Sequence, residues 1–225
     1  MLVKLQNISK SYGNPDDATF QSVLKNLELH VAEGETIAIL GPSGSGKSTL
    51  LNIIGTLDYP DTGSLIYNDR TINELSSDEI DQFRNREIGF VFQFHHLLPQ
   101  CNVLENILIP TLVNKGSLKE DNEHAEFLLN KVGLWEHRYK KPGQLSGGEC
   151  QRVAVVRSMI NRPSLILADE PTGALDGKNV DAISDLLLKL NKEENVSLIL
   201  VTHSEILALQ MGTVYELNEG CLSKK

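Results

Sequence analysis

The first part of the chain has the hydrophobic pattern of short strands. Apolar residues alternate with polar ones or run together at residues 3–8, 23–31, 36–40 and 64–67, between turns rich in Gly, Pro, Asn and Asp. The run at 36–40 leads directly into a glycine-rich stretch, after which apolar residues recur at helical spacing from Leu50 to Ile54. We therefore expect a strand, a glycine loop and a helix in succession.

From about residue 97 to residue 161 the pattern is helical. Apolar spacing predicts helices at 103–112, 119–132 and 148–160, and an earlier helix begins at the capping-box pair Ser76 and Glu79, just before a strand at 89–93. Strands return at 164–168 and 197–201 around a helix near 180–190, and residues 214–222 predict a hairpin. This alternation predicts an α/β fold with a mostly parallel, helix-covered sheet and a helical lobe inserted at about 95–160.

Composition narrows the possible partners. The 225 residues, 40% of them hydrophobic, are enough for a single domain, 1–225, with a buried core. The chain has 21 basic and 30 acidic residues, so it lacks the positive field with which nucleic-acid-binding proteins engage phosphates. We therefore expect no nucleic acid as a partner. A local phosphate site remains compatible with this charge, because a few backbone N–H groups and one lysine suffice to form it.

Cysteine content and hydropathy indicate where the chain works. Cys101, Cys150 and Cys221 are odd in number and far apart, which is typical of a reduced, cytosolic protein. The first residues lack the apolar core of a signal peptide, and no apolar run reaches the roughly 20 residues that span a bilayer. We expect no direct membrane insertion, so any work on a membrane would require a partner that anchors the chain.

The glycine-rich stretch completes a phosphate-loop pattern. It consists of Gly41, Pro42, Ser43, Gly44, Ser45, Gly46, Lys47 and Ser48, followed by Thr49. Its glycines let successive backbone N–H groups surround phosphate oxygens, and the following helix directs its positive end at the same anion. The pattern predicts an ATP site in which Lys47 contacts the β- and γ-phosphates, Ser48 binds Mg²⁺ and Thr49 helps to hold the α-phosphate.

A second candidate group follows the strand at 164–168. Adjacent acids at the end of a buried strand suit a metal ligand beside a residue that positions the attacking water. We assign the metal to Asp169, and the role of catalytic base or water-positioning residue to Glu170. Alone, Asp-Glu-Pro is also an ordinary strand-ending turn. Together with the phosphate loop, it predicts a phosphoryl-transfer site.

The segment Leu145-Ser146-Gly147-Gly148-Glu149-Cys150-Gln151 resembles the signature of the ABC ATPases, and the resemblance covers nearly the whole chain. It implies the ABC ATPase fold, which is a P-loop NTPase core with antiparallel strands near the N-terminus and an inserted helical subdomain. It also implies that the chain hydrolyses ATP. Two cassettes of this family enclose each ATP between the phosphate loop of one and the signature of the other. The resemblance therefore implies an ATP-bound homodimer in which Ser146, Gly147 and Gly148 complete the partner's site.

Other positions match the family's site residues. The resemblance implies that Tyr12 stacks on adenine, and that Gln93 joins the nucleotide site to the lobe and contributes to Mg²⁺ binding and catalysis. It also implies that Asp176 meets the opposing subunit at the nucleotide, and that His203 contacts the γ-phosphate. The alternative for Tyr12 is a surface tyrosine in a Ser-Tyr-Gly turn.

Two positions depart from the family's pattern. Cys150 stands where Gln or Arg is common, and Ser204 stands where Asp is common. Neither change removes a group with a direct chemical role, so we expect the ATPase activity to survive both.

Residues 55–63, 92–99 and 168–176 resemble one branch of the family, which holds the LolD, MacB and FtsE ATPases. The pair His95-His96 before Leu-Leu-Pro is most similar to the ATPases of lipoprotein-releasing systems. This implies a peripheral protein at the cytoplasmic face of the inner membrane that powers LolC/LolE-like transmembrane permease subunits. The alternatives are MacB-type export, FtsE-type cell division and a soluble ABC ATPase. The last kind usually has two cassettes or a coiled-coil insertion, which this sequence does not show.

The segment after Gln93 allows two interpretations. Phe94, Leu97 and Leu98 either form an exposed surface that passes movement to a membrane partner or pack the lobe against the core. Neighbouring side chains of an extended chain point to opposite sides, so we expect His95 and His96 to contact a partner rather than a metal.

Overall fold

The computed structural model describes residues 1–14, 17, 19–114, 116–173 and 177–225. One sheet has four strands in the order β2-β1-β4-β5, and the other has six in the order β10-β9-β3-β8-β7-β6. The strands are β1 (Val3–Tyr12), β2 (Gln21–Val31), β3 (Thr36–Leu40), β4 (Thr62–Tyr67), β5 (Arg70–Thr71), β6 (Ile88–Phe92), β7 (Leu165–Asp169), β8 (Ser197–Thr202), β9 (Thr213–Asn218) and β10 (Cys221–Lys224). The α/β class predicted from the hydrophobic pattern is confirmed.

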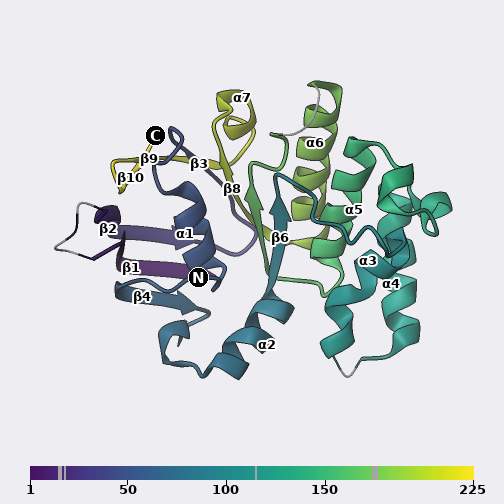
Figure 1. Ribbon diagram of the computed structural model, residues 1–225, viewed down its shortest axis with the longest axis horizontal. Coiled ribbons are helices and arrows are strands. Elements are labelled where there is room, and N and C mark those ends of the chain that lie inside the picture. The colour runs from purple at the N-terminus through teal and green to yellow at the C-terminus, as the bar shows by residue number, and fades with distance from the viewer. Residues whose placement is uncertain (15–16, 18, 115, 174–176) are drawn as a thin grey trace.

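Helices connect and cover these strands. They are α1 (Lys47–Ile54), α2 (Ser77–Glu87), α3 (Val103–Leu108), α4 (Leu118–Lys131), α5 (Gly147–Met159), α6 (Gly177–Glu194) and α7 (Glu205–Ala208), with the 3-10 turns η1 (Ile72–Glu74), η2 (Ile109–Val113), η3 (Trp135–His137) and η4 (Pro142–Gln144). In Figure 1 the four-stranded sheet and α1 lie at the left, whereas α3, α4 and α5 lie together at the right, beyond β6. No helix among the described residues is both long enough and apolar enough to cross a membrane.

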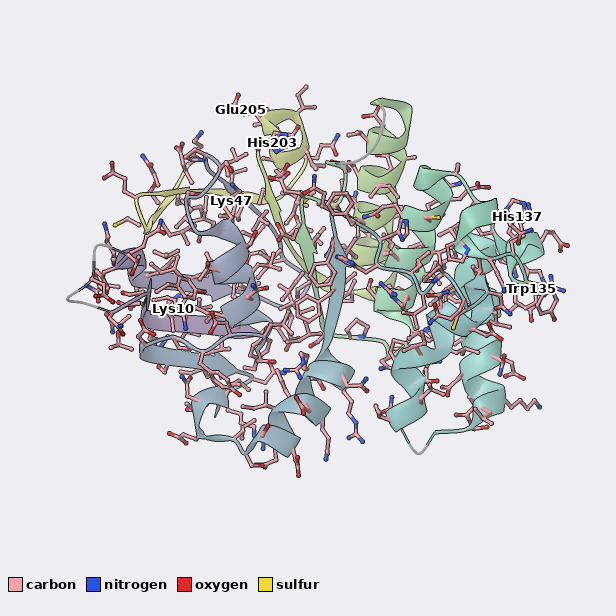
Figure 2. All side chains as sticks on the ribbon, in the orientation of Figure 1. Lys10, Lys47, Trp135, His137, His203 and Glu205 are labelled. Atoms are coloured by element: carbon pink, nitrogen blue, oxygen red, sulfur yellow. The ribbon has the colours of Figure 1, made fainter. Side chains whose placement is uncertain are left out.

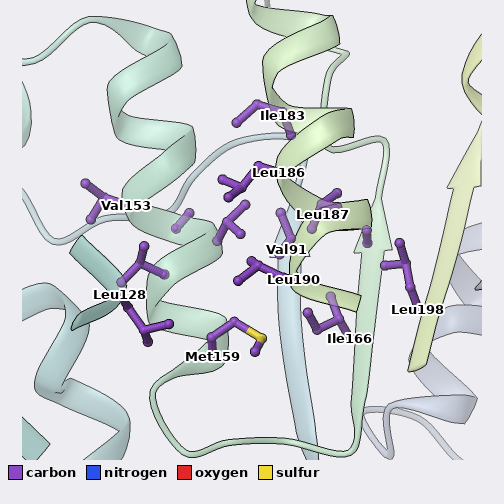
Figure 3. Packing of buried hydrophobic residues seen from close by; sticks show 14 of the residues in the cluster. Val91, Leu128, Val153, Met159, Ile166, Ile183, Leu186, Leu187, Leu190 and Leu198 are labelled. Atoms are coloured by element: carbon purple, nitrogen blue, oxygen red, sulfur yellow. The ribbon is translucent and has the colours of Figure 1, made fainter. Parts of the chain in front are cut away.

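The six-stranded sheet separates two hydrophobic cores. Strand β3 pairs in parallel with β8 and β9, and β7 pairs in parallel with β6 and β8. Side chains alternate between the two faces of each strand. In β7, for example, Leu165 and Leu167 join the core shared with α1 and the four-stranded sheet, whereas Ile166 and Ala168 face the helices on the other side. Figure 3 shows this second core, in which Ile166 and Val91 pack beside Leu187 and Leu190 of α6.

Two predicted helices show how the local sequence determines where a helix begins and ends. The capping box of Ser76 and Glu79 is present at the start of α2, as predicted. The single helix predicted at 103–112 is wrong, because α3 ends at Leu108 and the tighter turn η2 follows, with Pro110 at its start. Proline has no N–H to donate and its ring clashes with the preceding helical turn, so the α-helix does not continue through it.

Candidate functional site

The parallel pairing brings four chain segments to one edge of the sheet. Strands β3, β8, β7 and β6 are neighbours in that order, and all four end at the same edge because they are parallel. The phosphate loop follows β3, His203 follows β8, Glu170 follows β7 and Gln93 follows β6. Figure 2 shows Lys47 and His203 at this end of the molecule. Residues separated by up to about 160 positions therefore share one site.

The phosphate loop is tightly built. Gly46 caps α1 with a left-handed φ of 100°, which a residue with a side chain adopts only at a cost. A Cβ on Gly41 would lie 2.4 Å from the carbonyl oxygen of Leu217, so this position excludes any side chain. Lys47 is 9% exposed, and its Nζ donates to the carbonyl oxygens of Gly41 at 2.9 Å and Pro42 at 3.0 Å. The lysine near the end of the loop is thereby tied to the two residues at its start.

Ser45 contributes a side-chain hydroxyl to this loop. Ser45 Oγ is buried and has no hydrogen-bond partner within the described part of the chain. Buried hydroxyls in native proteins are normally paired. The loop thus offers a donor, a buried ammonium group and the start of α1 at one place, which suits a phosphate group.

Asp169 lies beside the phosphate loop, and Gln93 follows the strand next to that of Asp169. Burial raises the pKa of the Asp169 carboxyl above its usual range and nearby Glu170 adds to this rise, although a side-chain hydrogen bond with Ser48 and the charge of Lys47 act against it. Asp169 pairs with Phe92 in the β6–β7 ladder, so Gln93 begins the adjacent loop. The Gln93 side chain also lies against Gly173, where a Cβ would be 2.9 Å from Gln93 Nε2.

Glu170 sits in a strained and well-held position. Its backbone φ is 46°, in the left-handed region that residues other than glycine seldom adopt. Its Oε2 lies 2.9 Å from His203 Nδ1 and accepts a hydrogen bond from Thr202 Oγ1 at 3.2 Å. Thr202 Oγ1 in turn accepts from the Ser204 backbone N–H at 3.1 Å, which leaves the threonine hydroxyl proton for Glu170.

Tyr12 belongs to a cluster beside the phosphate loop. Its hydroxyl donates to Asp58 Oδ2 at 2.7 Å, and Lys10 Nζ donates to Asp58 Oδ1 at 2.9 Å. Burial by itself would raise the pKa of Asp58, but the hydrogen bonds from Tyr12 and Lys10 outweigh it and lower that pKa. The Tyr12 side chain remains 43% exposed, so its hydroxyl is anchored while its ring stays accessible.

The signature residues begin α5, which lies apart from α1 in Figure 1. Ser146 caps the helix, and its side chain exchanges hydrogen bonds with Glu149 in a capping box. Ser146 and Gly147 are exposed, whereas Gly148 is buried. Cys150, one of the two departures from the family pattern, is 3% exposed and faces the core. The predicted site residue Asp176 lies outside the described residues.

Residues 94–99, which follow Gln93, differ from the exposed, extended segment that was one of the two interpretations. Leu97 is 6% exposed and belongs to the hydrophobic core, so 94–99 is not an exposed segment throughout, although Phe94 is 64% exposed. The chain is not extended at the paired histidines either, because His96 has a φ of 47°. The reasoning that placed the two side chains on opposite sides of an extended chain is therefore wrong.

Several polar residues of this region were not predicted from the sequence. Arg157 donates to the carbonyl oxygens of His95 and His96, each at 2.8 Å. Asn106 is fully buried and bonds to both the backbone N–H and the carbonyl of Leu98. A polar residue among the apolar positions of a helix was the available signal for Asn106, but its partners depend on the tertiary structure.

Known proteins resemble the chain over its whole length. The model of the ABC transporter family matches residues 24–173. The lipoprotein-releasing system ATP-binding protein LolD of Idiomarina loihiensis is 45% identical, over 100% of this chain and 97% of that protein. The corresponding LolD of Geobacter metallireducens is 46% identical, over 97% of this chain and 96% of that protein.

Solved structures agree with these relatives. The dimeric, post-hydrolysis structure of the ATP-binding cassette MJ0796 bound to ADP and Pi has a TM-score of 0.89 and 40% identity, and the match covers 100% of this chain and 98% of that one. The structure of CbiO1 from Clostridium perfringens has a TM-score of 0.87 and 28% identity, with 99% and 86% of the two chains covered. The fold predicted from the resemblance is thereby confirmed, and the chain belongs to the ABC transporter family as an ATP-hydrolysing, ATP-binding protein of the LolD type.

Proposed function

We propose that this ATPase powers the release of lipoproteins through transmembrane permease subunits of the LolC/LolE type, as a peripheral protein at the cytoplasmic face of the inner membrane. The proposal rests on the two LolD relatives, which match at 45% and 46% identity with at least 96% of each chain covered. The observation that best supports ATP hydrolysis as its energy source is the contact of Glu170 with His203 and Thr202 beside the phosphate loop.

In the proposed mechanism, the phosphate loop, residues 41–49, holds the nucleotide. Lys47 would exchange its two carbonyl acceptors for oxygens of the β- and γ-phosphates, where its charge opposes the negative charge of the transferring group. The Ser45 hydroxyl, which has no hydrogen-bond partner among the described residues, and the N–H groups at the start of α1 would complete the cradle. Thr49 would support the α-phosphate, and the accessible ring of Tyr12 would stack on adenine.

Glu170 would take the proton from the attacking water. Its Oε2 is held by Thr202 and His203, which leaves Oε1 for the water. His203 would contact the γ-phosphate, and Gln93 would orient the water from the opposite side of Glu170. The left-handed backbone of Glu170 keeps the carboxylate at the end of the strand, at the edge of the sheet where the phosphate loop begins. Positioning and charge stabilisation are the main contributions that a protein makes to phosphoryl transfer.

Mg²⁺ fits the residues beside the phosphate loop. Ser48, Gln93 and Asp169 offer a hydroxyl, an amide and a carboxylate oxygen, the ligand atoms that this ion prefers. Burial disfavours the ionised form of Asp169, as its raised pKa indicates, and a nearby cation would offset that cost. When bound, Mg²⁺ would neutralise charge on the β- and γ-phosphates.

We further propose that the chain is one ABC domain, 1–225, with a helical lobe at about 95–160, and that it forms a homodimer on ATP. The exposed Ser146 and Gly147 at the start of α5 would complete the partner's nucleotide site together with Gly148, and Asp176 would contribute beside them. A helix start with free N–H groups is suited to an anion. The MJ0796 cassette, with 40% identity, is itself dimeric with ADP and Pi.

For the permease, we propose a contact surface next to the nucleotide site. Phe94 and Leu98 are 64% and 40% exposed, and the carbonyls between them are held by Arg157. Arg157 also lines a groove of about 1000 Å³ between α2 and α5, whose other walls include Phe90, Pro110 and Asn161. A permease segment seated there would contact both the sheet and the helical lobe.

Purification from detergent-solubilised membranes tests the proposal. The tagged chain should bring down transmembrane subunits, and lipoprotein added to that complex in lipid discs should raise its ATPase rate and be released. Glu170→Gln is the matched control, which should assemble without releasing lipoprotein. Recovery of the chain only with ribosomes or DNA, or a complex whose ATPase responds to another substrate, would overturn the proposal.

A further inference from the structure

Gln151 joins the signature helix to both catalytic loops. It lies on α5, three residues beyond Gly148, and its side chain is 2% exposed. Its Nε2 donates to the carbonyl oxygen of Phe92 at 2.8 Å and to that of Pro171 at 2.9 Å. Phe92 directly precedes Gln93, and Pro171 directly follows Glu170. One buried amide therefore bridges the two loops from the element that begins with the signature.

The orientation of this amide is dictated by its partners. Both are backbone carbonyls, which only accept hydrogen bonds, so the amide must present its NH₂ group and use one hydrogen for each. No other residue of similar length supplies two donors in one plane without a charge. The requirement at this position is thus for the chemistry of glutamine and not only for its volume.

The Gln151 amide lies next to the point where the pairing of strands β6 and β7 ends. Strands β6 and β7 pair up to Phe92 and Asp169, and the next residue, Glu170, leaves the strand with its left-handed backbone. Beyond this point the pairing does not continue among the described residues of the two loops. Gln151 connects the two loops through its two hydrogen bonds, so the relative position of Gln93 and Glu170 depends on α5 as well as on the sheet.

We propose that Gln151 is a positioning residue for hydrolysis, one that makes the placement of Gln93 and Glu170 depend on the position of the signature helix. The dependence rests on the site roles in the proposed function, in which Ser146, Gly147 and Gly148 bind the nucleotide of the opposing copy. A shift of α5 on engaging that nucleotide then moves the amide, and with it both loops of its own site. Chemistry at one site is in this way linked to occupancy of the other.

The test compares Gln151→Met, which keeps the length and removes both donors, with Val153→Ala. Val153 is fully buried on the same helix, and its aliphatic side chain forms no hydrogen bonds. Its truncation therefore loosens the packing of α5 and leaves the two hydrogen bonds of Gln151 in place. We measure melting temperature, ATP affinity, KM and kcat on the isolated full chain, below the melting temperature of both variants. This assay contains no permease, so its outcome is independent of whether lipoprotein release is the cellular role.

Gln151→Met should keep ATP affinity and KM within about twofold and lower kcat by about tenfold or more, as expected when groups that act only in the transition state are misplaced. Gln151→Glu should be at least as impaired, because a carboxylate would face two carbonyl oxygens. Val153→Ala should lower the melting temperature and keep kcat. A kcat for Gln151→Met equal to that of wild type, or a loss no larger than in Val153→Ala, would overturn the positioning role.

Discussion

His203 and Glu170 form a direct contact, with His203 Nδ1 2.9 Å from Glu170 Oε2. The same oxygen accepts from Thr202, so two residues of the β8 segment hold the side chain that follows β7. The His203 side chain is 73% exposed, whereas that of Glu170 is 17% exposed. The carboxylate is thus fixed from the protein side, and the histidine, which we propose contacts the γ-phosphate, remains largely exposed.

Replacing Glu170 with glutamine should separate ATP binding from hydrolysis. The amide keeps the size of the side chain but is a poor proton acceptor, so turnover should fall by roughly two decades or more while ATP affinity is kept. Nucleotide titration and a phosphate-release assay measure the two quantities. Near-normal turnover of Glu170→Gln would refute the assignment of the catalytic base.

Lys47→Ala should instead weaken ATP binding itself. The substitution removes a buried positive charge at the phosphates together with the two hydrogen bonds to Gly41 and Pro42, and charge-assisted contacts are among the strongest in a protein. We expect ATP affinity to fall by at least about tenfold, measured by calorimetry. Lys131→Ala is the matched control, because its ammonium pairs with Glu193 on α6 and should not affect the nucleotide. Unchanged affinity in Lys47→Ala would contradict the predicted phosphate contact.

Assembly should depend on the state of the nucleotide. If ATP bridges two copies through Ser146, Gly147 and Gly148, Glu170→Gln with ATP should be dimeric, whereas wild type with ADP should be largely monomeric. Size-exclusion chromatography with light scattering gives the mass in each case. Lys47→Ala with ATP should stay monomeric. A monomer under every condition, including in the presence of the permease subunits, would argue against the shared site.

The exposed and buried residues after Gln93 should respond differently to substitution. Phe94→Ser alters a side chain that is 64% exposed, so stability and basal ATPase should remain, while stimulation by the permease subunits is lost. Leu97→Ser alters a core residue and should lower the free energy of unfolding by about 2–4 kcal/mol, with basal ATPase reduced as well. The double variant His96→Ala with Leu97→Ser should therefore show the packing defect. Full stimulation of Phe94→Ser would contradict the contact surface.

The Lys10–Asp58–Tyr12 cluster predicts an acid-dependent stability difference. Asp58→Asn should lower the free energy of unfolding by about 1 kcal/mol at neutral pH, because the pair is partly shielded from solvent. The pKa of Asp58 is lowered in the folded state, so its contribution is complete above the unfolded value of 3.8 and is lost as pH falls through the folded value. Urea unfolding of both proteins should therefore converge in acid. A difference that persists at low pH would contradict the cluster's electrostatic role.

Local chemistry could be predicted from the sequence. The strand at 36–40, the glycine loop and the helix of α1 follow one another as predicted, and the capping box of α2 forms, because these features depend on neighbours along the chain. Parallel strands ending at one edge then follow from the alternation of strands and helices. The family resemblance added assignments that no single motif supports, such as the site role of His203.

Only the tertiary structure decided which polar residues connect distant segments. Gln151 bonds to Phe92, 59 positions away, and Arg157 bonds to His96, 61 positions away. Phe94 and Leu97 are apolar neighbours in the sequence, yet one is exposed and the other belongs to the core. Burial and the choice of a backbone acceptor depend on the packing of α5 against β6 and α3, which no local pattern encodes. Hydrophobic periodicity determines which elements form, and their packing determines which side chains meet.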